Sequence, residues 1–110
     1  MIRGYLEYSS TDRPDLFWTH DRIRGLTDHS PDDAYEVIRE LVRQASSDYV
    51  LSIVAAGPLE DLLSDWGERY IDRLEEDARV DPKLMAACAG VWQLFMSDTV
   101  WERLQRLVGK

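Results

Sequence analysis

The sequence predicts a single all-α domain over residues 1–110, with six or seven short helices stacked as helix hairpins and no sheet. Three observations indicate this fold class. All four prolines fit positions at which a helix starts. Neither Asn-Gly nor Asp-Gly, the dipeptides most typical of a β-hairpin, occurs in the chain. Two successive segments also have similar residues at positions 33 apart, as repeated helix pairs do, and we call this similarity the internal echo.

The composition is that of a folded protein with an acidic surface. Of the 110 residues, 45% are hydrophobic and 31% are charged, which is too apolar for a disordered chain. The formal net charge is −8, which disfavours binding to nucleic acid or to an anionic membrane. A cationic protein partner, or no charged partner at all, fits this charge better. The single cysteine, Cys88, excludes an internal disulfide and a cysteine-based metal site.

We expect a cytoplasmic location. The first residues, MIRGYLEYSS, lack the apolar core of a signal peptide. The most apolar stretch, residues 49–56, is much shorter than the roughly 20 residues that cross a membrane. An unpaired cysteine agrees with a reducing compartment.

Two helices are expected before residue 30. Residues 1–10 have the apolar spacing of a short helix, and the polar residues 9–12 form a turn. Pro14 then starts a second helix, which Gly25 weakens near its end. Its apolar residues are Phe17, Trp18, Ile23 and Leu26.

The sequence Ser-Pro-Asp-Asp at residues 30–33 is a strong helix start. Ser30 is a capping residue, Pro31 presets φ for the first turn, and the two carboxylates lie at the positive end of the helix dipole. The apolar residues that follow share one face, as in an amphipathic helix. They are Tyr35, Val37, Ile38, Leu41, Val42 and Ala45.

Residues 49–56 are apolar almost all round, which fits either a buried strand or a buried helix. We favour a helix, because no neighbouring segment offers a partner strand and residues 46–48 (Ser-Ser-Asp) can cap one. Gly57-Pro58 is expected to break this helix and to start another. A kink or turn is expected at residues 64–67, before an apolar stripe made of Tyr70, Ile71, Leu74 and Ala78.

Two further helix starts follow in the last third of the chain. Asp81-Pro82 begins a helix that is rich in small residues, and Ser97-Asp98 begins the final helix. Trp92 and Trp101 fall on apolar faces, so both are expected in the core.

The internal echo pairs one helix hairpin with the next. A shift of 33 positions places similar residues on one another: Ile38 on Ile71, Leu41 on Leu74, Ala45 on Ala78, Asp48 on Asp81, Leu51 on Leu84, Ala56 on Ala89 and Gly57 on Gly90. Stacked helix pairs of this kind are typical of short α-solenoids. The alternative is an ordinary compact bundle whose helices share leucine and alanine stripes by chance.

The run from Gly57 to Trp92 resembles the signature of a family of short bacterial proteins that is known only as a domain of unknown function. The matching motifs are GPLEDLL at residues 57–63, Gly67-Glu68, Ile-Asp-Arg at residues 71–73, Asp81-Pro82 and Gly-Val-Trp at residues 90–92. The upstream aspartate-rich helix start and Trp18 are similar more loosely. The resemblance implies a small helical fold and no particular activity.

The chain departs from that family pattern at two positions. Trp66 stands where the family is expected to have a histidine, and Cys88 stands where a small residue without sulfur is expected. If that histidine carries a function in the family, this chain lacks it.

Residues 60–81 form the most acidic segment, with nine carboxylates against three arginines. Asp61 and Asp65, or Glu68 and Asp72, would lie one helical turn apart and form a patch for a basic protein partner. Trp66, at the expected kink, would be a partly exposed interface anchor. The alternatives are a solvated helix face that keeps the protein soluble, and a metal site, which needs carboxylates that converge from several elements.

The remaining candidates give no catalytic residue, metal ligand or cofactor site. His20 and His29 have aspartate neighbours, but adjacent residues on a helix do not face each other, and no nucleophile motif accompanies them. Cys88 lies among alanines and is expected to be a small buried hydrophobic residue.

The sequence therefore favours a non-enzymatic protein-interaction module, of which an immunity or inhibitor protein against a basic toxin would be one form. The alternatives are an enzyme or small-ligand binder with its site in a helical cleft, and self-association through an apolar face.

Overall fold

The computed structural model describes residues 4–6 and 18–109, and every regular element in those ranges is helical. Residues 4–6 are helical. The elements that follow are α2 (Trp18–His29), α3 (Pro31–Gln44), α4 (Asp48–Val54), the π-helix η2 (Ala55–Leu59), α5 (Glu60–Val80), α6 (Pro82–Ala89) and α7 (Asp98–Leu107). The predicted turn at residues 9–12, the helix start at Pro14 and the side chain of Phe17 lie outside the described residues.

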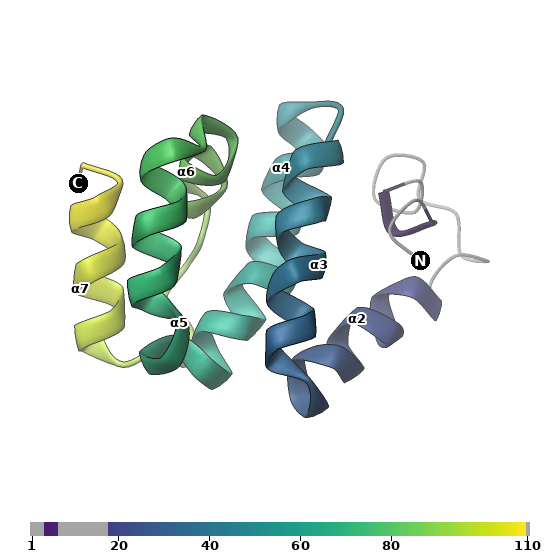
Figure 1. Cartoon of the computed structure of the whole chain (residues 1–110), viewed down its shortest axis with the longest axis horizontal. Helices are drawn as coiled ribbons and strands as arrows, with labels where there is room; N and C mark the ends of the chain where they lie inside the picture. The colour runs from purple at the N-terminus through teal and green to yellow at the C-terminus, as the bar shows by residue number, and fades with distance from the viewer. Residues whose placement is uncertain (1–3, 7–17, 110) are drawn as a thin grey trace.

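The helices follow one another in chain order along the longest axis of the molecule (Figure 1). α3 and α4 form one antiparallel pair, α5 and α6 form the next, and α3 packs on both members of the second pair. α2 covers one end of the described structure and α7 covers the other, within extents of 38 × 28 × 21 Å. The predicted all-α fold of packed helix hairpins is confirmed.

Three of the predicted helix starts are capped as the sequence indicates. The Ser47 hydroxyl accepts a hydrogen bond from Val50 N at 3.2 Å. The Asp81 carboxylate accepts from the backbone N–H groups of the two residues after Pro82, and the Ser97 hydroxyl accepts from Val100 N at 3.2 Å. Ser30 occupies the N-cap of α3, but its side chain makes no capping bond. These bonds satisfy backbone donors that a helix leaves free at its start.

The predicted break at Gly57-Pro58 is wrong. The chain stays helical from α4 through η2 into α5, with Pro58 buried inside the π-helical turn. Glu60 N donates across this wide turn to the carbonyl of Ala55, five residues back. A π-turn accommodates proline because it shifts the hydrogen-bond register at the point where the ring removes a donor and crowds the preceding turn.

The predicted kink at residues 64–67 is confirmed. Trp66 leaves helical geometry, with φ −134° and ψ 21°, while the helix continues on both sides of it. Gly67 then packs against α7, and a methyl group on its Cα would lie 3.0 Å from a methyl carbon of Val100. The absence of a side chain at Gly67 therefore allows α5 and α7 to approach closely at the bend.

The core contains the apolar residues that the internal echo pairs. Ile38 and Ile71, Leu41 and Leu74, Ala45 and Ala78, and Leu51 and Leu84 are all buried. Ala56 and Ala89 are both exposed. The expectation of an apolar helix buried all round at residues 49–56 is wrong at Tyr49, Ser52 and Ala56, which are exposed.

We expect Gly67→Ala to lower the free energy of unfolding by about 1 kcal/mol, measured by urea denaturation. Alanine gains roughly 0.5–1 kcal/mol over glycine within a helix, but overpacking against Val100 costs about 1–3 kcal/mol. Gly25→Ala in α2 is the matched control, because a methyl group there meets none of the described atoms within 4 Å. That control is expected to be stabilising, and equal stabilisation by both variants would contradict close packing at Gly67.

Candidate functional site

The carboxylates in the first half of α5 lie against an arginine of α2. Arg24 contacts Asp61 at 3.2 Å and Asp65 at 3.0 Å, and it also pairs with Asp28 on its own helix. The three carboxylates raise the pKa of Arg24, although partial burial acts in the opposite direction. Two members of the predicted acidic face are therefore partly neutralised by a single guanidinium group.

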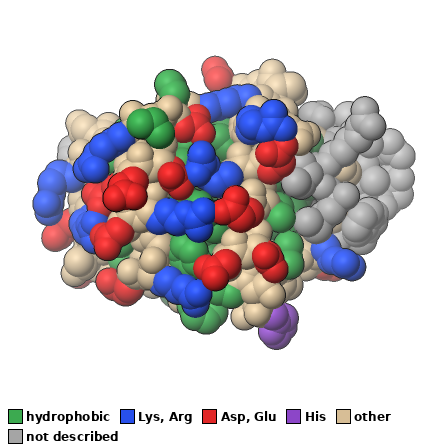
Figure 2. Space-filling view, in the orientation of Figure 1, with side chains coloured by type: hydrophobic (Ala, Val, Ile, Leu, Met, Phe, Trp, Pro, Cys, Tyr) green, Lys and Arg blue, Asp and Glu red, His purple; other side chains and the backbone are tan. Residues whose placement is uncertain are grey.

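The carboxylates further along α5 pair with arginines of α3 and α7. Arg103 of α7 contacts Asp72 at 2.5 Å and also Glu75, and these two carboxylates raise its pKa. Arg39 of α3 contacts Asp77 at 2.7 Å. On the face seen in Figure 2, acidic and basic side chains are accordingly interspersed, so this part of the surface carries little local excess of either charge.

The five residues of the predicted partner-binding face do not form one continuous patch. Asp61 and Asp65 turn toward α2, whereas Asp72 turns toward α7 at the other end of the described structure. Trp66 is half-buried, and its indole Nε1–H donates to the carbonyl of Thr27 at 2.8 Å. Trp66 thus anchors α5 to α2 at the kink.

Glu68 differs from the other carboxylates of this set. Its Oε1 accepts a hydrogen bond from the Ser97 hydroxyl at 2.5 Å, and Ser97 also caps α7. Within residues 4–6 and 18–109, Glu68 forms no ion pair. Among the described residues, no cation is therefore paired with this carboxylate beside the start of α7.

Three of the exposed large apolar side chains lie on the segment between α6 and α7, which we call the aromatic loop (residues 90–97). Trp92 is 73% exposed, Leu94 is 61% exposed and Phe95 is 87% exposed. The prediction that Trp92 lies in the core is wrong, because the helical pattern on which it rests ends at Ala89. The signal available in the sequence was a run of large apolar residues between a glycine and a serine helix cap.

Buried residues hold the aromatic loop from beneath. Glu60, only 5% exposed, accepts a hydrogen bond from Trp92 N at 2.8 Å. Val91 and Met96 are buried, and Gln93 donates to Asp98 Oδ1 at 2.9 Å. The loop is therefore attached to α5, to the core and to the start of α7, while its large side chains point outward. Burial raises the pKa of Glu60, and the Trp92 N–H partly offsets this effect.

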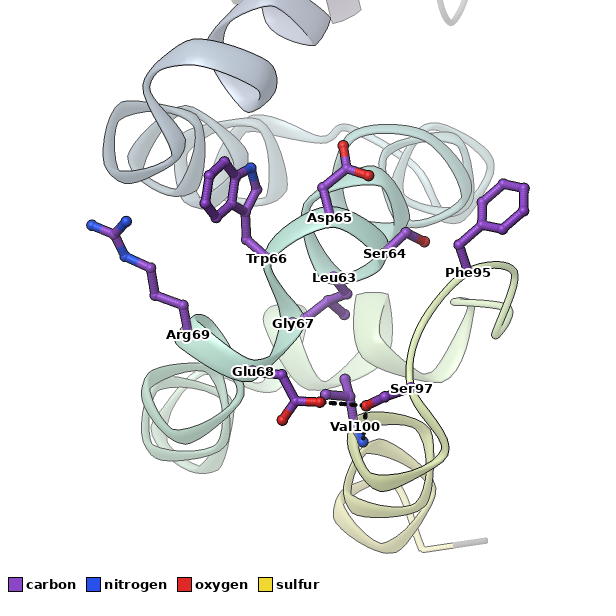
Figure 3. Close-up of a pocket in the computed structure, with 10 residues that line it drawn as sticks. All are labelled: Leu63, Ser64, Asp65, Trp66, Gly67, Glu68, Arg69, Phe95, Ser97 and Val100. Atoms are coloured by element: carbon purple, nitrogen blue, oxygen red, sulfur yellow. Dashed lines mark hydrogen bonds between the residues drawn. The ribbon is translucent and has the colours of Figure 1, made fainter.

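A pocket of about 320 Å³ lies beside the loop at the bend of α5, and we call it the kink pocket. It is lined by Leu63, Ser64, Asp65, Trp66, Gly67, Glu68, Arg69, Phe95, Ser97 and Val100. Figure 3 shows Glu68 directed toward Ser97, and Phe95 on the side of the pocket formed by the loop. A second hollow of about 320 Å³ lies between Trp92 and Trp101. Each exposed aromatic residue of the loop thus borders a pocket.

The histidines and the cysteine are not part of this surface. His29 is exposed at the end of α2, and the side chain of His20 lies outside the described residues. Cys88 is fully buried, as predicted, and burial raises its pKa to about 12. In the described part of the chain, no three His, Cys, Asp or Glu side chains are placed to hold a metal ion. None of the described helices is long and apolar enough to cross a membrane.

The fold and the surface define a small all-α protein that presents an apolar loop next to a carboxylate-bearing pocket. The chain belongs to a family of unknown function (DUF6869), whose model matches residues 7–110. The expected membership in a family without an assigned function is confirmed. No curated protein and no solved structure matches the chain.

We expect Glu60→Gln to become more stabilising relative to the wild type as the pH rises from about 4 to 7. Burial raises the pKa of Glu60 above its ordinary value of 4.5, so folding favours the protonated form. The contribution of this residue to stability is full below that ordinary value and is lost as the pH rises through the raised pKa. Glutamine keeps an oxygen acceptor for Trp92 N and carries no charge.

The measurement is urea denaturation of both proteins at each pH. Glu76→Gln serves as the control, because Glu76 is an exposed carboxylate of the same helix. The free energy of unfolding of Glu60→Gln is compared with that of the wild type. If the difference stays constant with pH, or if the wild type becomes the relatively more stable protein as the pH rises, Glu60 is not held in an unfavourable charged state.

Proposed function

We propose that this protein is a non-enzymatic protein-interaction module whose aromatic loop binds a basic protein partner. The observation that carries the proposal is the exposure of Trp92, Leu94 and Phe95 on a loop that is itself attached to the core. Large apolar side chains exposed together on a small protein are typical of interaction surfaces.

The attachment of the loop supports this function energetically. Binding incurs an entropic cost for every loop and side chain that must be ordered. Here the Trp92 backbone is bonded to Glu60, and Val91 and Met96 are already buried. Aromatic side chains presented on a fixed backbone contribute contact area at a low additional cost, and tryptophan is among the residues enriched at interface hot spots.

The charge around the loop supports a basic partner. Glu68 and Asp98 lie at the edge of the loop, and neither forms an ion pair with any residue in the described part of the chain. Most carboxylates along α5, by contrast, are matched by arginines of neighbouring helices. The net charge of −8 attracts a cationic protein at long range, and the unmatched carboxylates beside the loop direct it there.

The acidic face expected from the sequence enters this proposal through Asp65 and Glu68, which both line the kink pocket. Trp66 supports the pocket, and Asp61 and Asp72 contribute to the overall charge. An inhibitor or immunity protein that covers a basic toxin or nuclease is one form of this function. A cytoplasmic location is part of the proposal and agrees with the unpaired, buried Cys88.

The kink pocket supports one alternative function, namely the binding of a small ligand. Its volume of about 320 Å³ falls at the lower end of the usual range for ligand pockets, and it combines apolar lining with carboxylates. A basic protein is favoured, because the apolar surface extends beyond the pocket to Trp92 and Leu94.

The test compares a loop variant, Trp92→Ala with Leu94→Ala, with a control in which Tyr49→Ala and Val80→Ala remove exposed apolar side chains outside the loop. The basic partner is first captured from source lysate with the wild type and then purified, and its dissociation constant is measured for each variant. We expect the loop variant to bind about 30-fold more weakly or worse, as loss of a hot spot implies, and the control to bind as the wild type does.

All four substituted residues are exposed, so thermal unfolding should stay close to that of the wild type. Equal affinities for the loop variant and the control would contradict the proposal, as would a partner whose binding strengthens with added salt. A failure of the wild type to retain any basic protein would favour the alternative function.

A further inference from the structure

The kink pocket has the features of a receptor for one amphipathic side chain. Its inner lining comes from Leu63 and Val100, which are buried, and from Gly67, which has no side chain. Phe95, 87% exposed, stands on the loop side of the pocket (Figure 3). An aliphatic chain inserted here would contact apolar atoms along its length, while its end would reach the polar edge.

That polar edge is negatively charged. Glu68 uses Oε1 to accept from Ser97 and forms no ion pair with any described residue, so one oxygen and the full charge remain for a ligand. Asp65 shares Arg24 with Asp61 and Asp28, and three carboxylates on one guanidinium leave a local excess of negative charge. The edge of the pocket therefore favours a cation.

Arg69, which also lines the pocket, is engaged elsewhere. The Arg69 guanidinium bonds to both oxygens of Asp32 at 3.2 Å and lies 5.5 Å from the centre of the Tyr70 ring. These contacts hold it on the α3 side, and Figure 3 shows it directed away from Glu68. The cationic position beside Glu68 is thus not filled by this arginine.

The chemistry of the lining favours one kind of cation. A guanidinium group is planar and weakly hydrated, so it pairs with a carboxylate and also stacks on an aromatic face, which an ammonium group does less well. Glu68 and Phe95 both line the pocket and therefore favour an arginine side chain over a lysine side chain.

We propose that the kink pocket binds an arginine side chain of the basic partner. The aliphatic part packs on Leu63 and Val100, the guanidinium pairs with Glu68, and Phe95 offers a ring face to the cation. This inference rests on the proposed function and specifies which side chain of the partner enters the site.

The test uses Nα-acetyl-L-arginine methylamide as the probe and ¹H–¹⁵N spectra of the labelled protein as the readout. We expect saturable shifts of the Gly67 and Ser97 amides and of the Trp66 indole, with a dissociation constant in the millimolar range. The corresponding citrulline derivative has nearly the same shape and no charge, and it should bind about fivefold more weakly or worse. The lysine derivative should also bind more weakly than the arginine derivative.

Two variants localise the effect. Glu68→Gln keeps an acceptor for Ser97 and removes the charge, so it should weaken arginine binding about fivefold. Glu76→Gln removes an exposed carboxylate of the same helix that does not line the pocket, and it should leave binding unchanged. Unchanged amide shifts across α3 would show that both variants keep the fold.

Absence of saturable shifts would overturn the inference, as would equal binding of citrulline, equal or tighter binding of lysine, or equal weakening by the two variants. The proposed function has a separate test, because loss of partner binding through Trp92 and Leu94 does not depend on the pocket. Partner binding that needs the loop while the arginine probe fails would leave the proposed function in place and remove this inference alone.

Discussion

The structure depends on one long helical segment that must bend to fit the molecule. From Asp48 to Val80 the chain stays helical for 33 residues, which would extend about 50 Å if straight. The longest extent of the whole described structure is 38 Å. The kink at Trp66 resolves this mismatch, and it both forms the kink pocket and lets Gly67 pack against α7.

The charged residues of α5 act mainly within the protein. Tyr35 and Tyr70 stack at 5.5 Å between α3 and α5, and their hydroxyl groups donate to Asp77 and Asp32. Burial and the nearby Asp32 raise the pKa of Tyr70 to about 12. Individual surface ion pairs contribute about 0–1 kcal/mol each, so their value here lies in fixing the register of α3, α5 and α7. The acidic segment of α5, which the sequence predicts to be a binding surface, thus serves partly to hold neighbouring helices together.

The parts of the fold that follow short-range rules could be predicted from the sequence. Helix starts at Ser47, Asp81 and Ser97 depend on bonds that span two or three residues, and these predictions are confirmed. The continuity through Pro58 could not be predicted, because a proline inside a helix is tolerated only when the surrounding packing stabilises a wider turn.

The candidate site was harder to predict, since it depends on contacts between distant segments. The partner of Asp72 is Arg103, 31 positions further along the chain, and the partner of Asp65 is Arg24, 41 positions before it. The spacing of the carboxylates in the sequence predicts which of them are neighbours on α5. It does not predict which of them form ion pairs with arginines of other helices. Glu68 was among the predicted residues, but its contact with Ser97 and the exposure of Trp92 became apparent only when α7 and the loop were placed against the bend.

Because Cys88 is buried, the native protein is unreactive toward thiol reagents. With its pKa raised to about 12 and its sulfur enclosed by the core, this thiol becomes reactive only when the chain opens, so its alkylation rate reports global unfolding. A cysteine introduced at an exposed position such as Leu94 would then be the reactive thiol of the folded protein. A fluorophore or cross-linker could be attached at the loop without first removing the native cysteine.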